Sequence, residues 1–127
     1  MSDEKRIQSH RDLNVWQFGM DIAERVYDLT RSFPKDEMYG LTSQLRRAAV
    51  SVPANIAEGN ARSSTKEYLH LLSVSIGSLA EVETYLELSL RLGYGDPAAI
   101  HKLDQLIGEE RRMLRGLQRA LRNKLSS

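Results

Sequence analysis

The fold is decided by the stretch GLTSQLRRAAVSVPANIAEGNAR at residues 40–62. Apolar residues recur in it every three or four positions, which is the period of one face of an α-helix. A proline at position 53 lies inside this run, and inside a helix it removes one backbone donor at a cost of about 3 kcal/mol. We therefore predict a helix from Leu41 to Arg62 that kinks or splits at Pro53, with the kink favoured. Its expected buried face consists of Leu41, Leu45, Ala48, Ala49, Val52 and Ile56.

Three further segments show the same helical period, at about residues 12–32, 65–92 and 96–125. The first is expected to begin with Asp12 as its N-cap and to end before Pro34, because a residue that precedes proline disfavours the helical region. Its expected buried stripe consists of Leu13, Trp16, Met20, Ala23, Tyr27 and Thr30.

The other helix ends carry clear local signals. Ser64 and Glu67 have the spacing of a capping box, and Gly93 suits the left-handed residue that follows a helix. Asp96 and Pro97 supply an acidic N-cap and a proline in the first helical position. The expected stripe of the last helix consists of Leu103, Leu106, Ile107, Leu114, Leu117, Leu121 and Leu125. Short links between four helices predict an all-α, antiparallel up-down-up-down four-helix bundle over residues 12–127, after a flexible tail at 1–11.

Composition limits the environment and the partners. The 127 residues carry a net charge of +1 and contain no cysteine, which favours a reducing compartment, so we expect a cytoplasmic protein. No apolar run approaches the length of about 20 residues that crosses a membrane, and no membrane partner is expected. The charge is uneven, because six basic and two acidic residues after position 108 give that segment a net charge of +4.

The third helix has more apolar surface than one bundle buries. One expected side contains Tyr68, Leu72, Leu79, Val82, Leu86 and Leu90, and a second contains Val74, Tyr85, Leu88 and Leu92. Soluble monomers avoid large exposed apolar patches, so the second side predicts a homo-oligomer. Gly77 in the same helix either permits close packing by another subunit or is a tolerated glycine.

A narrow polar strip runs along the second helix. Its members are Gln44, Arg47, Ser51, Asn55, Glu58 and Arg62, within roughly 80° of a helical wheel. Apolar residues flank the strip on both sides, which indicates a partly buried hydrogen-bonding seam, although an ordinary exposed strip is the alternative. Buried polar groups need partners, so we expect Arg47 and Arg62 to pair with Glu58, or with Glu81 and Glu83 of the third helix.

No catalytic pattern is present in the sequence. Glu67 and His70 have the spacing used by di-iron bundles, but such sites need a second pair and two more glutamates. The sequence contains no glycine-rich phosphate loop, and no histidine lies near Ser51 or Ser78 in the sequence to activate them. We therefore predict no enzyme activity, no cofactor and no metal.

Basic residues line one face of the last helix, at Arg111, Arg115, Arg119 and Arg122. Such a stripe binds phosphates, and Arg46 and Arg47 of the second helix could extend it. The alternative is that these arginines only solvate the helix and oppose its negative C-terminal dipole.

The stretch at residues 40–62, with DLNVWQ at 12–17 and GSLAEVE at 77–83, closely resembles the four-helix bundle protein family, whose members are also called 23S rRNA intervening-sequence proteins. The resemblance implies a homopentameric ring of up-down bundles with no established enzymatic activity. The characteristic positions of the family are matched by Gln44, Arg47, Ser51, Pro53, Asn55, Ile56, Glu58, Gly59, Arg62, Gly77, Ser78 and Glu81.

More distantly, the chain is similar to accessory proteins of diversity-generating retroelements, which are basic barrels that bind nucleic acid and a reverse transcriptase. The net charge of +1 departs from that branch. The first functional hypothesis is therefore a self-assembling scaffold or partner-binding ring. The second is a nucleic-acid-binding accessory protein that uses the basic residues of the ring.

Overall fold

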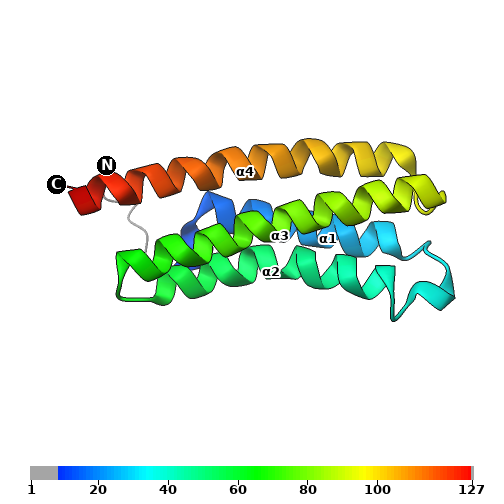
Figure 1. Cartoon of the computed structure of the whole chain (residues 1–127), viewed down its shortest axis with the longest axis horizontal. Coiled ribbons are helices and arrows are strands. Elements are labelled where there is room, and N and C mark those ends of the chain that lie inside the picture. Colours follow the sequence, from blue (N-terminus) through cyan, green and yellow to red (C-terminus); the bar gives the residue numbers. More distant parts are fainter. Residues whose placement is uncertain (1–8, 127) are drawn as a thin grey trace.

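The computed structural model describes residues 9–126 and forms an antiparallel four-helix bundle (Figure 1). Its helices are α1 (Asn14–Thr30), α2 (Leu41–Ala61), α3 (Thr65–Leu92) and α4 (Pro97–Ser126), and short 3-10 turns lie at His10–Asp12 and Lys35–Glu37. No strand occurs in this described part of the chain. Each helix packs on the two that neighbour it around the bundle, with α1 closing against α4. The predicted all-α up-down-up-down fold is confirmed.

The local signals at the ends of α3 and α4 act as expected, with one difference. The Ser64 hydroxyl accepts a hydrogen bond from the Glu67 amide at 3.2 Å, Gly93 adopts a left-handed φ of 77°, and Asp96 accepts from the Ala98 amide. The reciprocal half of the predicted capping box does not form, because the Glu67 carboxylate instead faces Arg62 at 3.7 Å.

Helix α1 differs from its prediction at its start and in the face that it buries. Asp12 is not the N-cap, because it belongs to the 3-10 turn capped by Ser9, and α1 begins only after Leu13. The folded chain therefore includes residues 9–11, whereas residues 1–8 of the expected tail lie outside the described residues. Met20 and Tyr27 of the expected stripe are exposed, and the buried residues are Val15, Gly19, Ile22, Ala23, Val26, Leu29 and Thr30.

Helix α2 continues through Pro53 as one helix and does not split. The proline ring is itself buried, so packing against the neighbouring helices stabilises a residue that is unfavourable in the helix interior. The expected apolar face is confirmed, since every one of its members is buried: Leu41, Leu45, Ala48, Ala49, Val52 and Ile56.

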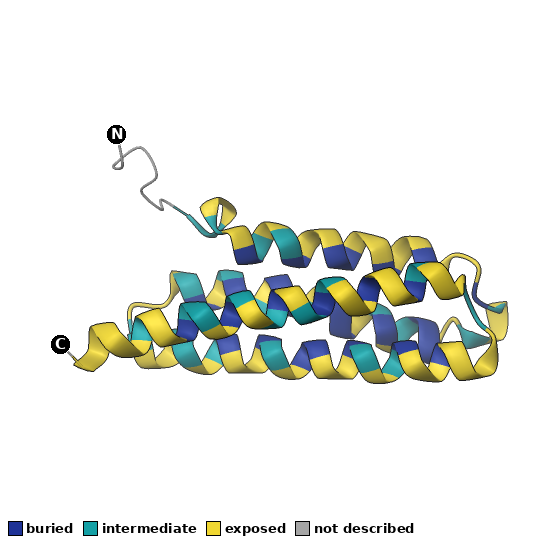
Figure 2. Ribbon diagram, turned by 90° about the horizontal axis from the view of Figure 1, so that it is seen from above, coloured by how far each residue is buried: buried dark blue, intermediate teal, exposed yellow. Residues whose placement is uncertain are grey.

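The core lies along the bundle axis, where the buried stripes of the four helices meet (Figure 2). Leu72, Leu79, Val82 and Leu86 of α3 are buried as expected, but Leu90 is exposed. On α4 the buried stripe contains two polar residues, Glu110 between Ile107 and Leu114, and Gln118 at its end. Leu125 is half exposed near the end of α4. None of the helices in residues 9–126 combines the length and apolar character that crossing a membrane requires.

Candidate functional site

The polar strip of α2 meets α3 in a short hydrogen-bonded seam. The hydroxyl groups of Ser51 and Ser78 are 2.7 Å apart. The Asn55 amide donates to the backbone carbonyl of Ser51 at 2.8 Å and to its hydroxyl at 3.0 Å. Ser51 and Asn55 are partly buried and Ser78 is buried, so these groups hold one another in a fixed arrangement between the two helices.

The remaining members of the strip lie at the surface. Arg62 pairs with Glu58 one turn earlier and with Glu67 of α3, and the hydrogen bond that Arg62 donates to Glu58 is the main reason that the pKa of Arg62 is raised. Glu83 does not contribute to the strip as expected, because it faces α4 and binds Arg111.

A shallow groove between α2 and α3 lies beside the seam. It has a volume of about 200 Å³. Its lining brings together residues that the sequence places far apart, namely Gln44, Arg47, Ala48, Ser51, Glu81 and Tyr85. The guanidinium of Arg47, the carboxylate of Glu81, the amide of Gln44 and the hydroxyl of Ser51 therefore line one small concave surface that offers both hydrogen-bond donors and acceptors.

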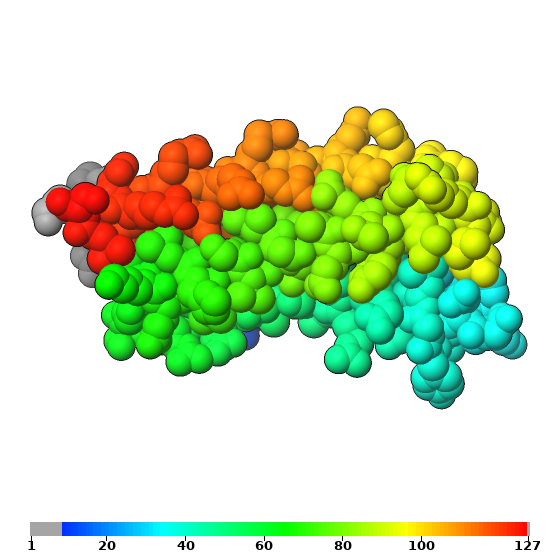
Figure 3. Space-filling view, viewed as in Figure 1, coloured from blue at the N-terminus to red at the C-terminus, as the bar shows by residue number. Residues whose placement is uncertain are grey.

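Apolar side chains are exposed on α3 next to this groove. Val74, Leu88 and Leu92 are 37%, 44% and 49% exposed, and we name these three residues the α3 ridge. Tyr85 is only partly buried. A Cβ added at Gly77 would meet no atom within 4 Å, so no other part of the described chain packs closely there. Figure 3 shows α3 crossing the middle of the bundle surface between α4 and α2.

The basic residues divide into two groups. Arg111 donates from both terminal nitrogens to Glu83, and Arg46 donates to the Thr30 hydroxyl at 2.8 Å and lies 4.5 Å from the ring centre of Tyr27. These two guanidinium groups are therefore occupied by contacts within the chain. The other predicted contacts on α4, Arg115, Arg119 and Arg122, are exposed.

Glu110 of α4 is a buried carboxyl group that the sequence reasoning missed. It is fully buried, and neither carboxylate oxygen has a hydrogen-bond partner. Burial alone raises the pKa of Glu110 to about 8. Glu110 lies beside Gly19 of α1, where an added Cβ would lie 3.1 Å from Glu110 Oε2 and within 3.5 Å of both Val52 and Pro53. The spacing of Glu110 from Ile107 and Leu114 is the signal that could have placed it in the core.

Gln118, two stripe positions further along α4, is the second buried polar residue that was missed. Its side-chain amide donates to the Ser73 hydroxyl at 2.9 Å and to the Leu69 carbonyl at 3.4 Å. It therefore joins α4 to α3 by hydrogen bonds, whereas the Glu110 carboxyl group is buried without any.

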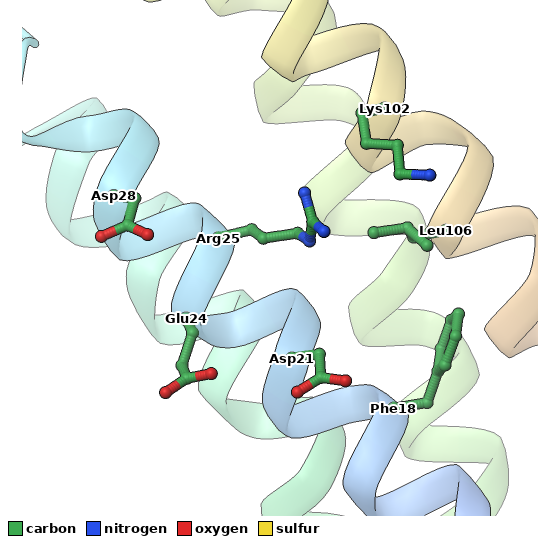
Figure 4. A pocket seen from close by; sticks show the side chains of 7 residues that line it. All are labelled: Phe18, Asp21, Glu24, Arg25, Asp28, Lys102 and Leu106. Atoms are coloured by element: carbon green, nitrogen blue, oxygen red, sulfur yellow. The ribbon is translucent and has the colours of Figure 1, made fainter.

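Two larger grooves border α1. The groove between α1 and α4 has a volume of about 670 Å³, and Figure 4 shows Arg25 reaching from α1 into it opposite Lys102 and Leu106 of α4. The groove between α1 and α2 has a volume of about 460 Å³ and is lined by Met20, Ala23, Glu24, Tyr27, Asp28, Arg31, Val50 and Pro53. Within residues 9–126 no three His, Cys, Asp or Glu side chains are grouped so that they could hold a metal ion.

Residues 11–116 match the family model described as 23S rRNA-intervening sequence protein. The match covers all of α1, α2 and α3 and two thirds of α4. The chain belongs to the 23S rRNA-intervening sequence protein family. The family resemblance found in the sequence is thereby confirmed, whereas the more distant likeness to retroelement accessory proteins stays a prediction.

A solved structure shares the fold of this intervening-sequence family chain. It is a protein of unknown function from the S23 ribosomal protein family of Bacteroides thetaiotaomicron VPI-5482, with a TM-score of 0.75 and 21% sequence identity. The alignment covers 82% of this chain and 97% of that one. No curated protein matches the chain. Neither the family nor this structure indicates an enzyme class.

Proposed function

We propose that the chain is a non-enzymatic, self-assembling helical bundle that acts as a scaffold or partner-binding ring in the cytoplasm. The observation that carries this proposal is the α3 ridge, where apolar side chains are exposed beside the α2–α3 groove. Apolar side chains that are exposed together on one face are typical of a surface that another protein covers. The proposed number of five subunits rests on the family resemblance alone. The absence of cysteine supports a reducing compartment such as the cytoplasm.

The test is the native mass of the protein by light scattering at micromolar concentration. The wild type is expected to be an oligomer, and Leu88→Asp is expected to shift the mass towards the single subunit because it places a charge in the interface. Leu125→Asp is the matched control, since Leu125 is 50% exposed, close to the 44% of Leu88, but lies at the far end of α4. A wild-type protein with the mass of one subunit would refute the proposal.

Gly77→Ala separates assembly from the stability of the helix. An alanine at this open helical position is expected to stabilise an isolated subunit by about 1 kcal/mol, because glycine is a poor helix former. If a neighbouring subunit packs on Gly77, the same methyl group weakens assembly. A variant with a higher urea midpoint and a lower oligomer mass at the same concentration would support close packing at this position.

Nucleic-acid binding is the second candidate function, and the exposure of Arg115, Arg119 and Arg122 favours it. They lie three or four residues apart on α4, so their charges can follow a phosphate backbone. The triple change of these arginines to glutamine is expected to abolish retention of the protein on structured RNA at low salt. Arg91→Gln is the control, because Arg91 is an exposed arginine that already pairs with Glu87. No retention of the wild type would exclude this function.

A further inference from the structure

Two separate apolar surfaces are exposed on neighbouring sides of the bundle. The first is the α3 ridge. The second is the α1–α2 groove of about 460 Å³, whose apolar lining includes the exposed side chains of Met20, Tyr27 and Val50. A helix face is convex and this groove is concave, so the two surfaces differ in shape and neither is complementary to itself.

We propose that the α3 ridge of one subunit docks into the α1–α2 groove of the next, so that the subunits associate head to tail. This inference rests on the proposed self-assembly and identifies the two surfaces that meet. The pairing covers six of the ten large apolar side chains that are exposed in residues 9–126, three from the ridge and three from the groove. A contact of the ridge with its own copy would leave the side chains of the groove in water.

The charges beside the two surfaces are complementary. Glu24 and Asp28 lie at the groove, and Asp28 pairs with Arg31. Arg47 lies in the α2–α3 groove beside the ridge. Within the described part of the chain, neither Glu24 nor Arg47 forms an ion pair. Docking the ridge into the groove brings a free cation of one subunit towards a free anion of the next, which favours this partner and orientation.

The positions of the two surfaces favour a closed ring. The helices follow one another around the bundle as α1, α2, α3 and α4, so the α1–α2 side and the outer side of α3 next to α2 are neighbouring sides and not opposite ones. In a closed ring of n copies the two contact faces of each subunit diverge by 180° minus 360°/n, so contact faces on neighbouring sides of the bundle are compatible with a small closed ring. A head-to-tail contact between opposite faces would instead produce an open filament.

Chemical cross-linking tests the pairing, and the absence of native cysteine gives a clean background. Val50→Cys places one thiol at the groove, and Leu88→Cys places one on the ridge. A short bismaleimide is expected to cross-link an equimolar mixture of the two variants into dimers and to leave each variant alone uncross-linked. Val50→Cys mixed with Leu125→Cys is the matched control and is expected to give no dimer.

The outcomes separate this inference from the proposed function. An oligomer in which Leu88→Cys cross-links to itself would overturn the head-to-tail contact and leave self-assembly intact. An oligomer in which Val50→Cys and Leu88→Cys do not cross-link to each other would also overturn the head-to-tail contact and leave self-assembly intact. A monomeric wild type would overturn both.

In addition, Glu24→Arg is expected to weaken assembly by about tenfold, and Arg47→Glu in the same chain is expected to restore it.

Discussion

Replacing Glu110 with glutamine is expected to remove a pH-dependent loss of stability. The carboxyl group is fully buried without a hydrogen-bond partner, burial is the only cause of its raised pKa, and Gly19 beside it carries no charge. Nothing there stabilises an ionised carboxylate, so the folded protein holds the proton to a higher pH than the unfolded chain does. Glutamine has the same length and shape and cannot ionise.

The magnitude follows from the raised pKa of Glu110, about 8 against an ordinary value of 4.5. Between these values the folded state binds one more proton than the unfolded state, so the free energy of unfolding falls as the pH rises, by about 1.4 kcal/mol per pH unit. Below pH 4.5 the buried carboxyl group causes no loss in the free energy of unfolding. The loss reaches about 3 kcal/mol at pH 7 and about 5 kcal/mol above pH 8. This is a large share of the stability of a small domain.

The assay is urea unfolding followed by circular dichroism at pH 5, 7 and 9, at one fixed protein concentration because association also adds to the apparent stability. The wild type and Glu110→Gln are expected to have similar stability at pH 5 and to diverge by about 3 kcal/mol at pH 7, with the variant more stable. Glu109→Gln, at the exposed neighbouring position, is the control and should follow the wild type. Equal pH dependence of the wild type and Glu110→Gln would refute the reasoning.

Three further substitutions test local contacts by urea unfolding at pH 7. Ser64→Ala removes the hydroxyl that caps α3 and is expected to cost about 1 kcal/mol; an unchanged midpoint would contradict the capping role. Ser78→Ala removes the bond to Ser51 and is expected to cost about 1 kcal/mol, a small loss because Asn55 still donates to Ser51; a loss above about 3 kcal/mol would show a tighter network. Gly95→Ala is expected to cost at least about 2 kcal/mol, because φ is +79° and the new Cβ would lie 2.8 Å from Leu29 Cδ1. Gly93→Ala is the control, with a similar φ but open space around the new Cβ, and should cost about half as much. Equal losses of stability in the two variants would rule out the clash with Leu29.

Several surface and site features depended on the neighbouring helices. The aromatic and methionine side chains of α1 repeat with helical period, yet Met20 and Tyr27 are exposed. The reason is that α2 and α4 pack on the adjacent stripe of α1, which contains the buried residues named above. Arg111 belongs to the basic stripe by its spacing, but α3 places Glu83 against it and satisfies its charge. The sequence indicated a polar strip on α2, and the position of Ser78 opposite Ser51 decided which part of it became a hydrogen-bonded seam.

The sequence by itself determined the four helices and where α2, α3 and α4 begin. Ser64, Gly93 and the Asp96–Pro97 pair act through backbone geometry and hydrogen bonds within a few residues, so their effects can be predicted without the rest of the chain. Only the tertiary structure decided that Glu110 lies without a partner beside Gly19, and that Met20 and Tyr27 are exposed. Burial depends on atoms from helices far away in the sequence, and periodicity along one helix does not say which side its neighbours occupy.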